Sequence, residues 1–151
     1  MDDLDLQIIK KLQENAKLSL KKIAKMLKTP VSTVHFRVQK MINEKIIVKF
    51  SSVIDIGKLG YETVGWANLT VDPLKVDEVA NKIASFEEVR MVSMTGGTYN
   101  LVVQILAKNE KELWNFIREN IQTLDGVQKI DVNSSLKIFK WDTCYFCNIP
   151  G

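Results

Sequence analysis

Residues 19–44, SLKKIAKMLKTPVSTVHFRVQKMINE, decide the fold of the N-terminal third of the chain. Apolar residues recur at helical spacing on either side of residues 28–29, which predicts two amphipathic helices joined by a tight connection. Ser19 has a side chain suited to cap the first of these helices. The residues expected on its inner face are Leu20, Ile23, Ala24 and Leu27.

The second helix of this stretch is expected to begin at Pro30, with Thr29 as its cap. Proline suits a first helical position, because the N–H that it lacks would have no partner there. An earlier helix is indicated by Leu4, Ile8 and Leu12, and Asp2 or Asp3 can cap it. Residues 1–45 therefore predict a three-helix helix-turn-helix domain, whose last helix has an inner stripe of Val31, Val34, Val38, Met41 and Ile42.

The outward face of this last helix is expected to enter the major groove of double-stranded DNA. Gln39 suits adenine edges, Arg37 suits guanine, and Phe36 suits a thymine methyl group. An ordinary three-helix bundle with a solvated helix is the alternative, against which an exposed Phe36 argues. The residues expected on the outward face are Ser32, Thr33, His35, Phe36, Arg37, Gln39 and Lys40, and the lysines expected to anchor phosphates are Lys17, Lys21, Lys22, Lys28, Lys45 and Lys49.

Charge is distributed unevenly along the chain. This distribution indicates a basic region that binds a polyanion and a second region with a different function. Residues 1–50 hold 11 Lys+Arg and 5 Asp+Glu (11 − 5 = +6), whereas residues 51–151 hold 10 and 13 (10 − 13 = −3). The alternative is that this asymmetry arises by chance, because lysine-rich protein surfaces are common. The acidic start of the chain and the lack of a long apolar run lead us to expect a cytoplasmic protein without membrane contact.

The remaining two thirds of the chain contain two similar β-α-β units. Strands are expected at residues 63–71, 89–94, 99–107 and 127–139, and helices at 74–86 and 110–124, the first opened by Asp72-Pro73. Two such units predict a ferredoxin-like βαββαβ sandwich. The fold class is therefore α+β, with a helix-turn-helix domain at 1–45, a partly extended linker at 46–61 and a βαββαβ domain at 62–151. The sheet face without helices is expected to be covered by a second copy of the chain.

These residues resemble the Lrp/AsnC family of transcriptional regulators over essentially the full length of the chain. The resemblance rests on six segments in the right order: residues 4–16 at the opening helix, the pattern from Ile23-Ala24 to Met41, Ile54-Asp55, Leu59-Gly60, residues 95–101 and residues 124–127. It implies an effector site, at an interface between dimers, and assemblies that are commonly octamers. The effector residues that it indicates are Gly96, Gly97, Thr98, Tyr99 and Asn100, with Ser134 and Ser135 as weaker candidates for the same pocket.

The chain departs from the family pattern at functionally relevant positions. Lys28 stands for a turn glycine, Pro30 for a helix-starting serine and Lys45 for the glycine after the recognition helix. In the effector loop Thr98 and Asn100 replace two aspartates, and neutral oxygens are weaker partners for an ammonium group. Three interpretations stay open: a different effector, carboxylates recruited from elsewhere, or a plain glycine-rich hairpin without a ligand.

No constellation of residues indicates enzyme chemistry, and no cofactor is expected. Cys144 and Cys147 have the spacing of a redox or metal motif, yet a zinc site would need ligands from another subunit, so inert thiols or a disulfide are the alternatives. We therefore expect a sequence-specific DNA-binding regulator, not an enzyme and without a metal, whose assembly or DNA affinity responds to a small metabolite, with an amino acid favoured. The alternatives are an architectural DNA-wrapping protein without effector control and an α/β enzyme or metabolite-binding protein.

Overall fold

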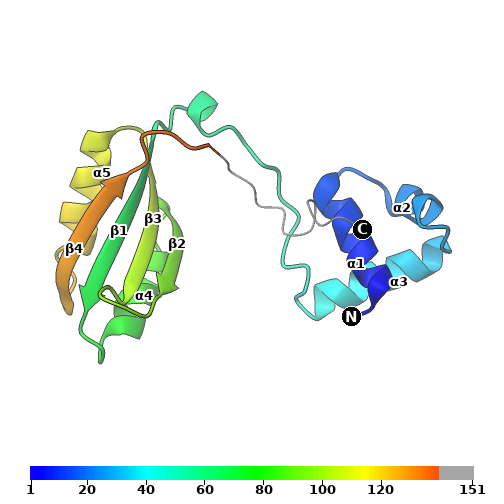
Figure 1. Cartoon of the computed structure of the whole chain (residues 1–151), viewed down its shortest axis with the longest axis horizontal. Coiled ribbons are helices and arrows are strands. Elements are labelled where there is room, and N and C mark those ends of the chain that lie inside the picture. The colour runs from blue at the N-terminus through cyan, green and yellow to red at the C-terminus, as the bar shows by residue number, and fades with distance from the viewer. Residues whose placement is uncertain (140–151) are drawn as a thin grey trace. The chain divides into compact units, whose positions relative to one another are not determined.

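The computed structural model describes residues 1–139, which form two compact units (Figure 1). The N-terminal unit spans Met1–Ile54, and the C-terminal unit spans Asp55–Phe139 within the described part of the chain. Each unit has its own cluster of buried apolar side chains, and the two clusters share no residue. The burial of separate cores identifies the two units as separate domains.

The N-terminal unit contains helices α1 (Asp3–Glu14), α2 (Leu20–Met26) and α3 (Val31–Asn43). Asp2 caps α1 in a reciprocal capping box with Asp5, because each side chain accepts a hydrogen bond from the backbone N–H of the other. The Ser19 side chain accepts from the backbone N–H of Lys22 at 3.2 Å and caps α2. Both expected caps are therefore confirmed.

The start of α3 differs from the expectation by one residue. Helix α3 begins at Val31, with Pro30 as a cap that makes no side-chain hydrogen bond. The Thr29 hydroxyl donates instead to the carbonyl oxygen of Leu27 at 3.0 Å, so it closes the preceding turn. Val31, expected on the inner stripe, is 45% exposed. The buried stripe of α3 consists of Val34, Val38 and Met41.

The C-terminal unit is a four-stranded antiparallel sheet with its helices on one face (Figure 1). The strand order is β2-β3-β1-β4, as two β-α-β units require. This arrangement confirms the α+β class and the ferredoxin-like topology. The elements are β1 (Thr63–Val71), α4 (Val76–Ala84), β2 (Val89–Met94), β3 (Leu101–Ala107), α5 (Glu110–Phe116) and β4 (Val127–Ser134).

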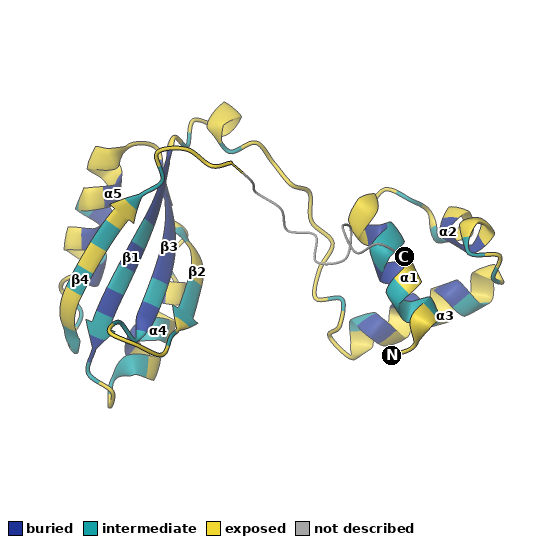
Figure 2. Cartoon of the chain, in the orientation of Figure 1, coloured by how far each residue is buried: buried dark blue, intermediate teal, exposed yellow. Residues whose placement is uncertain are grey.

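The core of this unit lies between the sheet and the two helices. Alternate residues of β1 point toward the helices, and Ala67, Leu69 and Val71 are fully or almost fully buried (Figure 2). Gly65 belongs to the same row and lies directly beneath Leu113 of α5, whose side chain fills the space that a Cβ at residue 65 would need. The opposite side of the sheet, which we call the open face, carries no helix of this unit.

Several expected boundaries are wrong, for identifiable reasons. Strand β4 ends at Ser134 instead of residue 139, because its last partner is Gly65, close to the start of β1. Helix α4 begins at Val76, since Asp72 closes a turn by accepting from the backbone N–H of Leu74 and does not cap the helix. Strand β3 begins at Leu101, two residues later than expected. Helix α5, expected to reach residue 124, is a regular α-helix only to Phe116. The chain continues from there as a π-helical turn over Ile117–Ile121.

The predicted linker forms no strand, although its apolar residues favour one. In residues 46–61 the only regular element is the 3₁₀ turn η1 (Gly57–Leu59). A strand needs a neighbour for its backbone hydrogen bonds, and the sheet of the C-terminal unit contains no segment from this part of the chain.

Candidate DNA-binding surface and effector site

Helix α3 is held against α1 and α2 by its buried valines, so its opposite face lies on the surface. The turn before it is closed by the backbone N–H of Thr29, which donates to the carbonyl oxygen of Ala24 at 2.9 Å. Lys28 adopts a left-handed conformation in this turn, with φ of 50°, and Lys45 does the same after α3, with φ of 56°. Both positions are those where the resembled family usually has glycine, so the chain accepts backbone strain of about 1 kcal/mol at each.

Most of the predicted base-reading residues are exposed on α3. Phe36 is 69% exposed, and no large apolar side chain of α1, α2 or α3 is more exposed. Thr33 is half-buried, and so is Arg37. The exposed remainder of the predicted set consists of Ser32, His35, Gln39 and Lys40.

Arg37 does not point outward as expected. Its guanidinium donates to both carboxylate oxygens of Asp2, at 2.7 and 2.6 Å, and to Asp5 at 2.9 Å. Charge-assisted hydrogen bonds of this kind hold a planar guanidinium in one orientation. Arg37 therefore joins α3 to the start of α1, and the expected guanine contact is corrected to a contact within the domain.

This cluster shifts the pKa of each member. The hydrogen bond from Arg37 holds the pKa of Asp2 below its ordinary value of 3.8, and the backbone N–H of Asp2, followed by Arg37, does the same for Asp5. The two carboxylates in turn raise the pKa of Arg37. Because folding lowers both carboxylate pKa values, their contribution to stability is complete above pH 3.8 and is lost as the pH falls through the lower, folded values.

We expect Arg37→Ala to lower the melting temperature of the N-terminal domain most at neutral pH. The difference from the wild type should shrink as the pH falls below 3.8, because protonated carboxylates gain nothing from Arg37. Circular dichroism melts from pH 7 to pH 2 measure this difference. Lys40→Ala is the matched control, since the Lys40–Glu44 contact is a loose 3.8 Å pair. A difference that stayed constant with pH would contradict the assignment.

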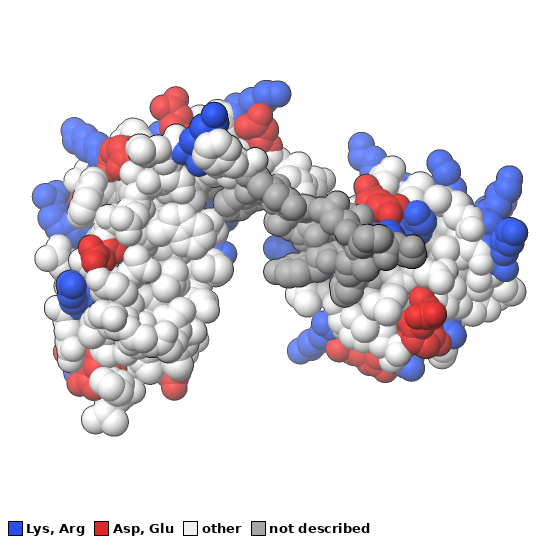
Figure 3. All heavy atoms as spheres, viewed as in Figure 1, with Lys and Arg blue, Asp and Glu red and all other residues white. Residues whose placement is uncertain are grey.

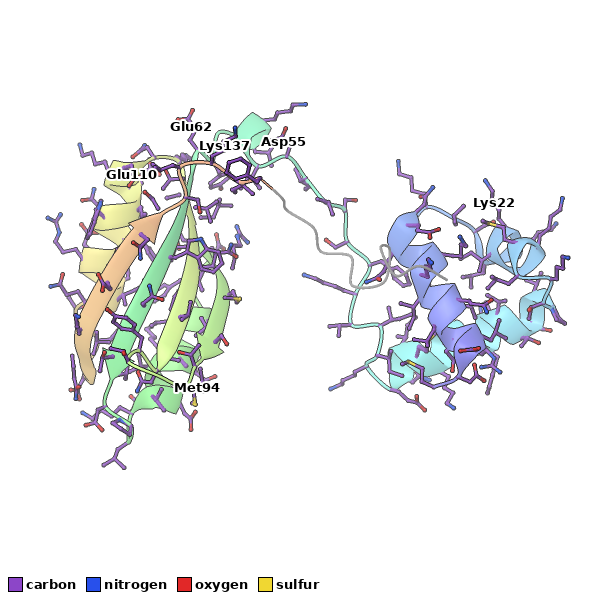
Figure 4. All side chains as sticks on the ribbon, in the orientation of Figure 1. Lys22, Asp55, Glu62, Met94, Glu110 and Lys137 are labelled. Atoms are coloured by element: carbon purple, nitrogen blue, oxygen red, sulfur yellow. The ribbon has the colours of Figure 1, made fainter. Side chains whose placement is uncertain are left out.

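The lysines expected at phosphates are exposed, as the prediction required. Lysine and arginine side chains project around α2 and the following turn in Figure 3, and Lys22 extends into solvent in Figure 4. Within the described residues, none of these lysines has an ion pair that would compete with a phosphate. The exposed set is Lys17, Lys21, Lys22, Lys28, Lys45 and Lys49.

The glycine-rich loop between β2 and β3 is fixed by the side chain of Asn100. The amide oxygen of Asn100 accepts from the backbone N–H of Val71 at 2.8 Å, and its nitrogen donates to the Val71 carbonyl at 2.6 Å. The Asn100 side chain thus forms two hydrogen bonds with the backbone of Val71, like those between neighbouring strands. Because these bonds occupy its amide group, the expected role of Asn100 as an effector contact is corrected. Gly96, Gly97 and Thr98 are exposed, and Gly97 has a φ of 132° that favours glycine.

Tyr99 brings together two residues that sequence reasoning missed. Its hydroxyl donates to the carboxylate of Asp131, and the Lys129 ammonium lies 3.4 Å from the same hydroxyl and 5.4 Å from the centre of the ring. Asp131 pairs with Asn68 in the sheet and shares the open face with it. The alternation of charged and apolar residues along 127–134 was the available signal for both. We call Tyr99, Lys129 and Asp131 the tyrosine cluster.

Ser134 and Ser135 do not share a pocket with this loop within one chain. Ser134 pairs with Gly65, whereas Asn100 binds Val71, six residues along β1, which corresponds to roughly 20 Å. Figure 4 shows the same separation, with Met94 at one end of the sheet and Lys137 at the other. The Ser135 hydroxyl accepts instead from the indole N–H of Trp66 at 3.2 Å. Within one chain these two serines therefore lie apart from the glycine-rich loop, and their place in a pocket between subunits stays a prediction.

The remaining features concern metal ligands, membrane spans and the two cysteines. Within residues 1–139 no group of three or more His, Cys, Asp or Glu is placed to hold a metal ion. None of the helices described is long and apolar enough to cross a membrane. Cys144 and Cys147 lie outside the described residues.

Comparison with known proteins agrees with this architecture. An AsnC-type helix-turn-helix domain matches residues 1–42, and an Lrp/AsnC ligand binding domain matches residues 66–143. The HTH-type transcriptional regulator FL11 of Pyrococcus horikoshii is 36% identical over 143 residues, which are 95% of this chain and 94% of that protein.

Solved structures show the same fold. E. coli AsnC has a TM-score of 0.87 at 24% identity and covers 95% of this chain and 97% of its own. The regulator NMB0573 of Neisseria meningitidis, solved as a complex with L-Met, has a TM-score of 0.88 at 17% identity and covers 98% of this chain and 97% of its own.

A helix-turn-helix unit followed by a ferredoxin-like ligand-binding domain defines a DNA-binding transcriptional regulator. The chain belongs to the Lrp/AsnC family of such regulators. Its curated relatives are named as regulators, in agreement with the expectation that the chain is not an enzyme.

Proposed function

We propose that this regulator binds a specific operator sequence through α3 and that an amino acid, bound at the tyrosine cluster, modulates its assembly or its DNA affinity. The observation that carries the DNA-binding part is the exposed outer face of α3 flanked by exposed lysines. Base edges are read by Ser32, His35, Phe36 and Gln39, whereas Lys17, Lys21, Lys28, Lys40 and Lys49 bind phosphates.

The effector part rests on complementary charges at one place on the sheet. Asp131 supplies the carboxylate that an α-ammonium group requires and that Thr98 and Asn100 lack. Lys129 supplies a cation for the α-carboxylate, and Gly96 and Gly97 are exposed in the loop that precedes Tyr99. The L-Met complex of the Neisseria regulator supports an amino acid as the class of ligand on this fold.

The assembly follows from the open face of the sheet. Trp66 and Val102 are half-buried there, with no helix of the same unit above them. We infer that a second copy covers this face and that the dimers associate further, to octamers as the resemblance implies. Two helix-turn-helix units of a dimer then bind half-sites about 34–36 Å apart. The effector acts by binding one assembly or DNA-binding state better than another.

Footprinting on genomic DNA separates this function from that of an architectural DNA-wrapping protein. A sequence-specific regulator protects a defined operator at concentrations where flanking DNA stays open, because specific binding exceeds non-specific binding by at least about 1,000-fold. Uniform protection of every fragment would favour the architectural alternative. The absence of binding at moderate salt would contradict the DNA-binding assignment.

A thermal-shift screen with the twenty L-amino acids tests the effector site. We expect one of them to stabilise the C-terminal domain by about 2.7 kcal/mol at 100 times its Kd. Asp131→Asn should abolish this shift, because the amide still accepts from Tyr99 but no longer neutralises an ammonium group. Asp77→Asn, an exposed site on α4, is the matched control. A shift retained in Asp131→Asn would place the effector elsewhere.

A further inference from the structure

We propose that Phe36 reads thymine by contact with its C5-methyl group and that α3 is biased toward A·T pairs at this point of the operator. The inference rests on the proposed DNA-binding function and adds the residue that sets its base preference. Three observations carry it: the direction in which Phe36 points, the residues around it, and the engagement of the Arg37 guanidinium by Asp2 and Asp5.

Phe36 lies at the centre of the outward face of α3. An α-helix turns about 100° per residue, so Phe36 is about 200° from Val34, which is fully buried. Ser32 and Gln39 lie within about 60° of Phe36 on the same exposed face. A side chain directed straight away from the domain core is the first to meet the floor of the major groove when the helix docks.

The apolar character of this position is unusual for a surface that faces a polyanion. Phe36 is 69% exposed, and its ring has no aromatic or cationic partner among the described residues. Its exposed neighbours one turn away on the outward face are the hydroxyl of Ser32, the amide of Gln39 and the ammonium group of Lys40. The major-groove edge of DNA offers one apolar group, the C5-methyl of thymine. The ring therefore matches thymine, and Gln39 matches the adenine edge of a neighbouring pair.

The engagement of Arg37 within the domain strengthens this bias. Bidentate contact of arginine or lysine with guanine is the commonest specific contact in DNA recognition. Arg37 is the only arginine in residues 1–89, and both Asp2 and Asp5 hold it within the domain. The outward face of α3 thus offers no free arginine to guanine. Lys40 and His35 remain able to donate to guanine, and the experiment below leaves those contacts unchanged.

Replacement of thymine by deoxyuridine tests the inference. Deoxyuridine removes the methyl group and keeps the hydrogen-bonding edge. An operator is first selected from a random duplex pool, and each of its thymines is then replaced in turn. For the wild type we expect about a fourfold loss of affinity at one or two positions in each half-site, the equivalent of one buried methyl group. Phe36→Ala should bind the two duplexes equally, and its melting temperature should equal that of the wild type.

Asn43→Ala is the matched control, because it removes another exposed polar side chain of α3 that has no proposed role at the DNA and leaves the ring in place. It should keep the fourfold preference for thymine over deoxyuridine. A wild type that ignores deoxyuridine at every position, or a Phe36→Ala variant that keeps the preference, would overturn the inference while the operator itself stands. A pool from which no operator can be selected would overturn the proposed sequence-specific function and the inference with it.

Discussion

Charge reversal of Lys28 and Lys40 together is expected to lower operator affinity by at least about 100-fold at low salt. Both side chains are exposed, one in the turn before α3 and one on its third turn. Each reversal replaces an attraction to a phosphate by a repulsion, and binding to DNA depends strongly on such contacts. Fluorescence anisotropy titrations between 50 and 200 mM salt measure the affinity. The slope of log K against log salt should fall by roughly two.

A double variant of equal charge, Lys108→Glu with Lys111→Glu, is the matched control. Both residues are exposed and belong to the C-terminal unit, so the net charge changes equally but far less of the change falls on the DNA-binding surface. We expect less than about a fivefold loss from this control, because neither residue belongs to the DNA-binding unit and salt screens long-range effects of charge. Equal losses in the two variants would show that net charge governs binding, and unchanged affinity in Lys28→Glu/Lys40→Glu would exclude α3 as the docking helix.

Gly65→Ala is expected to destabilise the C-terminal domain by about 1–3 kcal/mol. A Cβ at residue 65 would lie 2.5 Å from Cδ1 and 2.7 Å from Cδ2 of Leu113, which is fully buried, so that this side chain would have to shift within a close-packed core. In a domain of this size each kcal/mol lowers the melting temperature by about 4–8 °C. Differential scanning calorimetry measures the shift, and the transition of the N-terminal domain serves as an internal reference.

Two further variants identify the cause of this loss. Gly96→Ala should leave the melting temperature unchanged, because nothing lies within 4 Å of a Cβ at that position. Combination of Gly65→Ala with Leu113→Ala should cost less than the sum of the two single changes, since the second creates the space that the first needs. Strict additivity, or a Gly65→Ala variant as stable as the wild type, would mean that β1 and α5 do not meet as closely as described.

The topology was predictable from the sequence because it depends on patterns that local physics enforces. Strands β1 and β2 have the predicted bounds, since both segments are rich in apolar residues and turn residues flank them. The caps Asp2 and Ser19 were equally predictable, because a capping side chain acts on the backbone within three residues. The order of the strands followed from the repeat of two β-α-β units.

The errors arise where a partner distant in the sequence decides the outcome. Arg37 is turned inward by Asp2, 35 residues away, and no helical periodicity reveals that pair. Asn100 is bound to Val71 across the sheet. Asp131 gained its place beside Tyr99 through the register of β4 against β1, which the sequence pattern does not specify. The exposure of the candidate residues was thus predicted, whereas the positions of side chains that tertiary pairing sets were missed.

The separation of the two hydrophobic clusters has an evolutionary consequence. Substitutions that repack Ile23 and Val34 leave the packing around Leu69 and Leu113 untouched, because no buried residue belongs to both clusters. Substitutions can therefore change the DNA specificity of such a protein without a change in its ligand specificity. They can equally change the ligand specificity and leave the DNA specificity unchanged. After gene duplication, the copies can diverge in one of these two specificities at a time. No evolutionary intermediate then has to lose the function of both domains at once.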